Sequence, residues 1–173
     1  LNTPGGRLFP IDNELLANMI AQEWSSQQST VKMGTMHLTS LTFTCLDNPS
    51  QLSEAKLARQ LCDYLHTDTL LYFDSNSIEQ LDRLQETQWR PLVDWFNAQF
   101  PDLKLRISKD IDHASTTGSS TPPLLFGENA TLEAENSFTR YLSRNFNLST
   151  LIAFNYIAEC LRSVILTVSP ASG

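Results

Sequence analysis

The stretch LSTLIAFNYIAECLRSVILTV, residues 148–168, is the most apolar part of the chain, and it decides the fold. Its length is close to that of a helix that spans a bilayer. Four polar residues nevertheless share one helical stripe in it: Asn155, Glu159, Arg162 and Ser163. Placing a glutamate and an arginine in hydrocarbon is costly. The sequence therefore predicts a buried core helix with one wet edge and no membrane insertion.

Apolar side chains recur at helical spacing along most of the remaining chain. Further helices are predicted over residues 12–28, 36–46, 53–66, 78–87 and 91–100, and around 138–146. Asp12 or Asn13 can cap the first helix, Ser77 can cap the fourth, and Pro91 suits the first turn of the fifth. Residues 69–73 fit either a short strand or a tight linker, and 103–107 alternate as an extended segment does. The predicted fold class is mainly α, an irregular helical bundle domain with at most one or two short strands.

The pattern divides the chain into four ranges. Residues 1–11 form an extended N-terminal segment, 12–109 the first part of the helical domain, and 131–169 its C-terminal helices. Residues 110–130 are predicted to be a mobile loop rich in Ser, Thr and Pro, because 110–123 hold too few apolar side chains to order themselves.

Charge constrains the partners. The net charge is −7, from 19 acidic and 12 basic side chains. Phosphate backbones require neutralising Lys and Arg, so this balance disfavours nucleic acid and favours a neutral or basic protein. Acidic residues gather between Asp63 and Glu86, which fits a solvated face that keeps the protein soluble. The alternative is an acidic docking face made of Glu79, Asp82 and Glu86.

No catalytic pattern stands out. The three cysteines (Cys45, Cys62, Cys160) and three histidines (His37, His66, His113) lack the spacing of a disulfide framework or a metal site. Glycine-rich phosphate loops and the nucleophile-elbow motif are also absent from the sequence. We therefore predict no metal, no cofactor and no enzyme activity. Trp24 and Trp95 are predicted core anchors, while Trp89 fits either the core or a partner surface.

Several short segments, in this order and spacing, resemble one family. They are Thr3-Pro4-Gly5-Gly6-Arg7-Leu8, Glu23-Trp24 with Gln27-Gln28, Thr35-Met36-His37-Leu38-Thr39, Leu46-Asp47-Asn48-Pro49, Thr67-Asp68-Thr69 with Tyr72, and Trp89-x-Pro91-Leu92 with Trp95. The set resembles the mitochondrial ATP synthase assembly chaperone that binds the alpha subunit of the catalytic head. Residues 161–168 look like a later helix of that family.

The resemblance implies a small β-rich subdomain followed by a larger helical domain, in the mitochondrial matrix. Relative to that pattern, this chain is expected to begin in the link between the two and to stop before the final acidic helices. Family members are expected to bind the free alpha subunit without using ATP and to shield its interface until the beta subunit replaces them. The resemblance thus predicts a chaperone that is a monomer when free. A diverged relative serving as a permanent structural subunit of a larger mitochondrial complex is the alternative.

Four residues at family-like positions next to turns or helix starts are the predicted partner contacts: Thr39, Asp47, Asp68 and Trp89. For Asp47 and Asp68, the competing interpretation is that the carboxylate caps a turn or a helix.

Overall fold

The computed structural model describes residues 1–73, 79–108 and 132–169. Within these ranges the chain is built from helices and contains no strand, and isolated β bridges pair Asn2 with Leu8 and Tyr72 with Ser108. The mainly helical fold class is confirmed. The predicted Ser77 cap and the predicted loop at 110–130 lie outside the described residues, and the division into four ranges stays a prediction.

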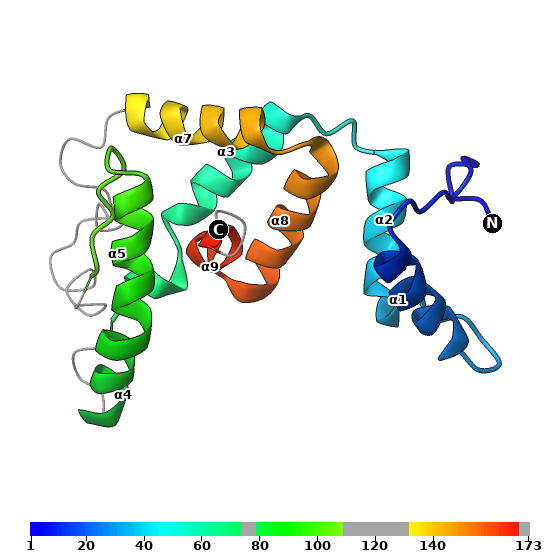
Figure 1. Cartoon of the computed structure of the whole chain (residues 1–173), viewed down its shortest axis with the longest axis horizontal. Helices are drawn as coiled ribbons and strands as arrows, with labels where there is room; N and C mark the ends of the chain where they lie inside the picture. The colour runs from blue at the N-terminus through cyan, green and yellow to red at the C-terminus, as the bar shows by residue number, and fades with distance from the viewer. Residues whose placement is uncertain (74–78, 109–131, 170–173) are drawn as a thin grey trace, which may run out of the picture.

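The first 48 residues form a part that we call the arm. It contains α1 (Glu14–Ser25), the 3-10 turn η1 (Met33–Thr35) and α2 (His37–Asp47). Asn13 caps α1 by accepting a hydrogen bond from the Leu16 amide, as one of the two predicted caps. Figure 1 shows α1 and α2 side by side at one end of the molecule, with α2 facing α8.

The described residues from Leu52 onward form the body. It comprises α3 (Glu54–Leu65), η2 (Thr69–Leu71), α4 (Glu79–Leu84), the π-helical turn η3 (Gln85–Trp89), α5 (Arg90–Gln99), α7 (Leu132–Asn145), α8 (Leu148–Leu161) and α9 (Val164–Val168). In Figure 1, α7 crosses the top of the view and α3 descends obliquely from it, α4 and α5 form a rod at one side, and α8 and α9 fill the centre. The main hydrophobic cluster lies in the body and contains Leu61, Phe96, Phe138, Leu142 and Ile165.

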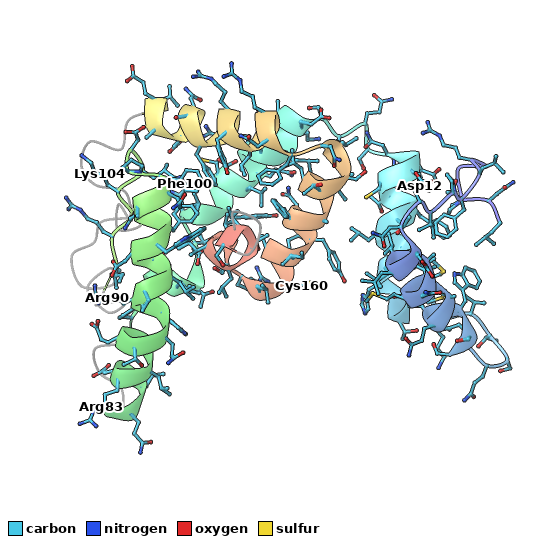
Figure 2. All side chains as sticks on the ribbon, in the orientation of Figure 1. Asp12, Arg83, Arg90, Phe100, Lys104 and Cys160 are labelled. Carbon is cyan, nitrogen blue, oxygen red and sulfur yellow. The ribbon has the colours of Figure 1, made fainter. Side chains whose placement is uncertain are left out.

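Aromatic rings join the helices of the body. Phe100 points from α5 toward the interior (Figure 2). Its ring centroid lies 4.9 Å from those of Phe96 and Phe138, and 5.1 Å from that of Tyr141. Edge-to-face contacts of this kind add to the stabilisation from burial alone. They attach α5 firmly to α7.

The single helix predicted over residues 148–168 is wrong. The chain breaks at Arg162, which adopts the left-handed conformation (φ 55°), and Ser163 then caps the short α9. The Asp68 carboxylate accepts hydrogen bonds from the freed amides of Val164 and Ile165, which satisfies the start of α9. No helix in the described ranges combines the length and the hydropathy that a membrane span requires.

One of three further segments differs from expectation. The helices predicted over 78–87 and 91–100 are joined by the π-helical turn at Gln85–Trp89, so the predicted break is absent, although Pro91 does lie in the first turn of α5. Residues 69–71 form a 3-10 turn, and Tyr72 makes one bridge to Ser108. Segment 103–107 is held by Asn97, whose side chain bonds both the amide and the carbonyl of Leu105.

Candidate partner-binding surface

The family-like segments meet in pairs, and the first pair joins α1 to α2. Met36 precedes α2 but has no side-chain oxygen that could cap it. Glu23 of α1 supplies the cap instead: its carboxylate accepts from the amides of Leu38 and Thr39, each at 2.8 Å, and from the Thr39 hydroxyl at 2.7 Å. Thr39 is 0% exposed. It braces the two helices of the arm from inside.

These hydrogen bonds affect the ionisation of Glu23. Burial acts to raise the pKa of the carboxyl, but the bonds from Thr39 and Leu38, with the nearby His37, outweigh it and leave the pKa lowered. The carboxylate is therefore the favoured form. A negative charge at the start of α2 also suits the helix dipole.

Asp47 joins the end of α2 to the N-terminal turn. Its two oxygens accept from the Thr3 hydroxyl at 2.6 Å and from the Gly5 amide at 2.8 Å. A methyl group on Gly5 would lie 2.7 Å from this carboxylate, so the close approach requires glycine. Arg7 adds a bond from its guanidinium to the Leu46 carbonyl. Asp47 is half-buried and engaged within the chain.

Asp68 joins the end of α3 to α9 and is 0% exposed. One carboxylate oxygen accepts from the Leu70 amide. The other accepts from the Ser163 hydroxyl at 3.1 Å and from the amides of Val164 and Ile165 at 2.7 and 3.0 Å. Burial raises the pKa of this carboxyl above its usual value, and the four hydrogen bonds offset only part of that effect.

Trp89 is half-buried at the junction of η3 and α5. Its ring makes an edge contact with buried Phe73, at 6.0 Å between centroids, and the Arg90 guanidinium lies over the same Phe73 ring. Trp89 packs against the main hydrophobic cluster of the body, and so do Trp95 of α5 and Leu41 of α2. Trp24 is half-buried within the arm. Direct partner contact stays a prediction for all four residues, and Thr39 and Asp68 are the two whose side chains are fully buried.

The predicted acidic docking face is partly described. The side chain of Glu79 lies outside the described residues, and Asp82 is half-buried on α4. Glu86 forms a bidentate ion pair with Arg90 one turn later on the rod. The charge of Glu86 is therefore compensated locally, and docking through this face stays a prediction.

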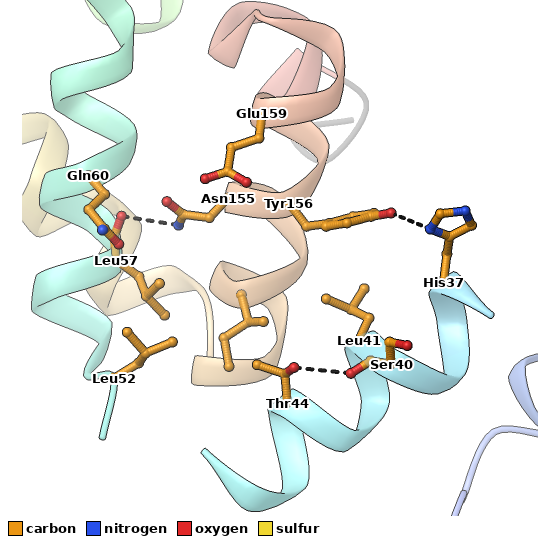
Figure 3. Close-up of a pocket in the computed structure, with 11 residues that line it drawn as sticks. His37, Ser40, Leu41, Thr44, Leu52, Leu57, Gln60, Asn155, Tyr156 and Glu159 are labelled. Atoms are coloured by element: carbon orange, nitrogen blue, oxygen red, sulfur yellow. Dashed lines mark hydrogen bonds between the residues drawn. The ribbon is translucent and has the colours of Figure 1, made fainter. Parts of the chain in front are cut away.

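A groove of about 350 Å³ lies between α2, α3 and α8, where the arm meets the body. Figure 3 shows leucines on its floor, polar side chains along its rim, and the Tyr156 hydroxyl bonded to His37 Nδ1 at 2.8 Å across one end. The sequence marked Asn155 and Glu159 as a wet edge of the last helical stretch. It did not reveal the groove, because the floor comes from three separate helices.

The described residues contain no group of three or more His, Cys, Asp or Glu that could hold a metal ion. Burial raises the pKa of Cys62 to about 11, and it also raises that of Cys45, so both thiols stay protonated at neutral pH. Cys160 is exposed on α8 (Figure 2). The fold and the site define a helical domain with a surface groove, in which carboxylates from other elements cap the starts of two helices.

Comparison with known proteins gives the family. The family model described as ATP12 chaperone protein matches residues 1–97, more than half of the chain. The chain is 28% identical over 174 residues to the mitochondrial protein atp12 of Schizosaccharomyces pombe, covering 96% of this chain and 55% of that protein. The chain belongs to the ATP12 chaperone family.

Solved structures agree with this assignment. The crystal structure of Atp12 from Paracoccus denitrificans superposes with a TM-score of 0.67 at 25% identity, over 98% of this chain and 65% of the other. The Atu1473 protein of Agrobacterium tumefaciens has a TM-score of 0.71 at 19% identity, over 100% and 58%, and shows the same fold. The chain thus spans about half to two thirds of the length of these proteins.

Proposed function

We propose that this protein is an assembly chaperone that binds the free alpha subunit of mitochondrial ATP synthase. In this proposal it works without ATP and shields the subunit interface until the beta subunit replaces it. The observation that carries the proposal is the family match over residues 1–97, supported by the likeness of the whole fold to bacterial Atp12. The mitochondrial relative favours the mitochondrial matrix as its location.

The chemistry of the described surface supports binding rather than catalysis. The thiols of buried Cys62 and half-buried Cys45 are poor nucleophiles because their pKa values are raised, and the described ranges contain no group of three or more residues that could hold a metal ion. Apolar side chains lie exposed on α1 and α8, among them Leu15 and Met19 on α1 and Ile157 and Leu161 on α8. Exposed apolar surface of this kind is typical of a protein that covers similar surface on a partner. We accordingly infer no cofactor, no nucleic-acid partner and no membrane insertion, and a monomer when free.

Co-purification of the native, full-length protein from mitochondria tests the proposal. Sizing and mass spectrometry of the material should find the free alpha subunit and none of the finished synthase. Stoichiometric recovery with an intact large complex would contradict a transient chaperone and support the permanent structural subunit. Recovery without any synthase subunit would contradict both.

The acidic face calls for a kinetic test. Reversal of Asp82 and Glu86 to lysine should slow association with the alpha subunit several-fold at low salt, and the difference should shrink as salt is added. Reversal of Asp102, an exposed carboxylate on the turn after α5, is the control. An unchanged association rate and salt dependence would mean that this face only keeps the protein soluble.

A further inference from the structure

The groove between α2, α3 and α8 has an apolar floor and a rim with one fixed charge. Leu41, Leu57 and Ile152 are among the floor residues. Of all the lining residues, Glu159 is the only one with a formal charge when histidine is neutral. Figure 3 shows its side chain on the same side of the groove as Asn155 and Tyr156, with Thr44 and Leu52 on the opposite side.

Several of the hydrogen-bond donors around the groove are used within the chain. The Asn155 amide nitrogen donates to the carbonyls of Leu57 and Leu151, at 3.2 and 2.9 Å. Because those carbonyls can only accept, the orientation of this amide is fixed and its oxygen is left as an acceptor. The hydroxyls of Thr44 and Ser40 also donate to backbone carbonyls.

Acceptors, by contrast, remain open. Glu159 receives one bond, from the Tyr64 hydroxyl to Oε1 at 2.9 Å, and its carboxylate has capacity for more. The oxygen of Asn155 has no donor among the described residues. An apolar trough that ends in open acceptors and a negative charge is complementary to a long side chain that has an aliphatic stem and a cationic head.

We propose that this groove binds a lysine or arginine side chain presented by an apolar-faced segment of a protein partner. The stem lies along Leu41, Leu57 and Ile152, and the cation is held by Glu159 with the oxygen of Asn155. The net charge of −7 favours the approach of such a segment. The inference extends the proposed function, since the segment belongs there to the client of the chaperone.

Positive charge nearby limits where the cation can lie. Arg162 lines a second hollow on the far side of Glu159, together with Tyr64 and Thr69, and does not line the groove itself. A cation therefore approaches Glu159 from the α2 side. The occupant then contacts α2 of the arm and α3 and α8 of the body together, so binding holds the two parts in one arrangement.

A titration of the full chain with a defined probe tests the proposal. The probe is a blocked helical peptide with leucines and a single lysine on one face, and the control peptide carries norleucine in place of lysine. We expect amide shift changes in nuclear magnetic resonance spectra at Gln60, Asn155 and their neighbours on α2. The lysine peptide should bind about tenfold more tightly than the norleucine peptide, the effect of one charge-assisted contact.

Matched variants separate the groove from general charge effects. Glu159→Gln keeps an acceptor for the Tyr64 hydroxyl and should weaken the lysine peptide about tenfold without lowering the melting temperature. Glu133→Gln, at an exposed position on α7, removes the same charge elsewhere and should leave affinity unchanged. Gln60→Trp, which fills the mouth from an exposed position on α3, should abolish binding.

Equal affinities of Glu159→Gln and Glu133→Gln for the lysine peptide, or shift changes confined to other faces, would overturn the proposal. The same variants should be assayed against purified alpha subunit. Binding of that subunit with no effect of Glu159→Gln or Gln60→Trp would overturn the groove and leave the proposed function standing. Binding of the lysine peptide in the groove without any binding of the alpha subunit would overturn the proposed function and leave the groove standing.

Discussion

The arm and the body are stabilised by different means. In the body, helices surround a continuous cluster of buried side chains crossed by aromatic contacts. In the arm, few apolar side chains are buried, namely Ile20 and Met36. The helices are held together by carboxylates that accept hydrogen bonds from backbone amides. The comparison teaches that the part with few elements, which has a small apolar interior, depends more on side-chain capping than the part with many.

One device recurs in both regions. The start of α2 is capped by Glu23 from α1, and the start of α9 is capped by Asp68 from the turn after α3. Each carboxylate thereby fixes the position of one helix relative to another. The two differ in burial, since Asp68 is 0% exposed and Glu23 is only half-buried, and that difference makes the comparison testable.

The largest effect is expected in the body. Phe138→Ala removes a ring that is 1% exposed and contacts Phe96 and Phe100, so it should lower the free energy of unfolding by about 3–5 kcal/mol. Leu15→Ala, which shortens an apolar side chain at a 70% exposed position of the arm, should change the free energy of unfolding by less than about 0.5 kcal/mol. Urea unfolding measures both, and similar costs would show that burial does not distinguish the regions.

Loss of the buried cap should come next. Asp68→Ala leaves four donors without their acceptor, two of them at the start of α9, and should cost about 3 kcal/mol. Asp68→Asn keeps one oxygen acceptor and should recover part of that cost in the same unfolding experiment. A loss below about 1 kcal/mol for Asp68→Ala would mean that water replaces the carboxylate and that the cap is not a structural requirement.

The arm should respond more weakly and more locally. Glu23→Gln replaces one of two accepting oxygens at the start of α2 and should cost about 1 kcal/mol. Hydrogen exchange should speed up at the Leu38 and Thr39 amides while the α7 and α8 amides keep their protection. Asp102→Asn is the control for removal of a surface charge. Equal acceleration across the body would show that the arm and the body unfold as one unit.

The smallest expected effect is the pH dependence of stability, which should have opposite signs for Glu23 and Asp68. The pKa of Glu23 is lowered below 4.5, so its contribution to stability is present above that pH and is lost as pH falls through the folded value. The pKa of Asp68 is raised above 3.8, so the folded state holds its proton longer and stability rises as pH falls through that window.

Unfolding between pH 7 and 4 checks both signs. The cost of Glu23→Gln should shrink on acidification, and the cost of Asp68→Asn should grow. Parallel changes in the two variants would show that the two carboxylates experience the same environment, and the distinction between arm and body would then fail for their caps.

Much of the fold could be read from local pattern. Asn13, Ser53 and Asn147 each accept an amide of the first turn of their helix, and the apolar stripe of Phe138, Tyr141, Leu142 and Phe146 faces the body core. Such signals depend on neighbours a few residues away, which is why helix positions are predictable. The break at Arg162 could not be predicted in this way, because the new helix start is held by Asp68, which is 95 to 97 positions away from the donors Ser163, Val164 and Ile165.

The candidate site was likewise predictable only in part. The sequence marked Glu23, Thr39, Asp47 and Asp68 as members of family-like segments, but it did not show that these segments meet each other. It placed Asn155 and Glu159 on one edge of an apolar helix, without showing that α2 and α3 complete a groove beside them. Capping across helices and grooves between helices depend on packing, and one-dimensional periodicity carries no record of which faces meet.

By itself, the sequence determined that the chain folds mainly into helices, where most of them lie, and which family it resembles, because amphipathic periodicity and short motifs are local properties. Only the tertiary structure decided that the apolar stretch at 148–168 is two helices, that three family-like carboxylates brace the fold from within, and that a groove opens between the arm and the body. Each of these depends on contacts between residues far apart in the chain, which form only when the helices pack.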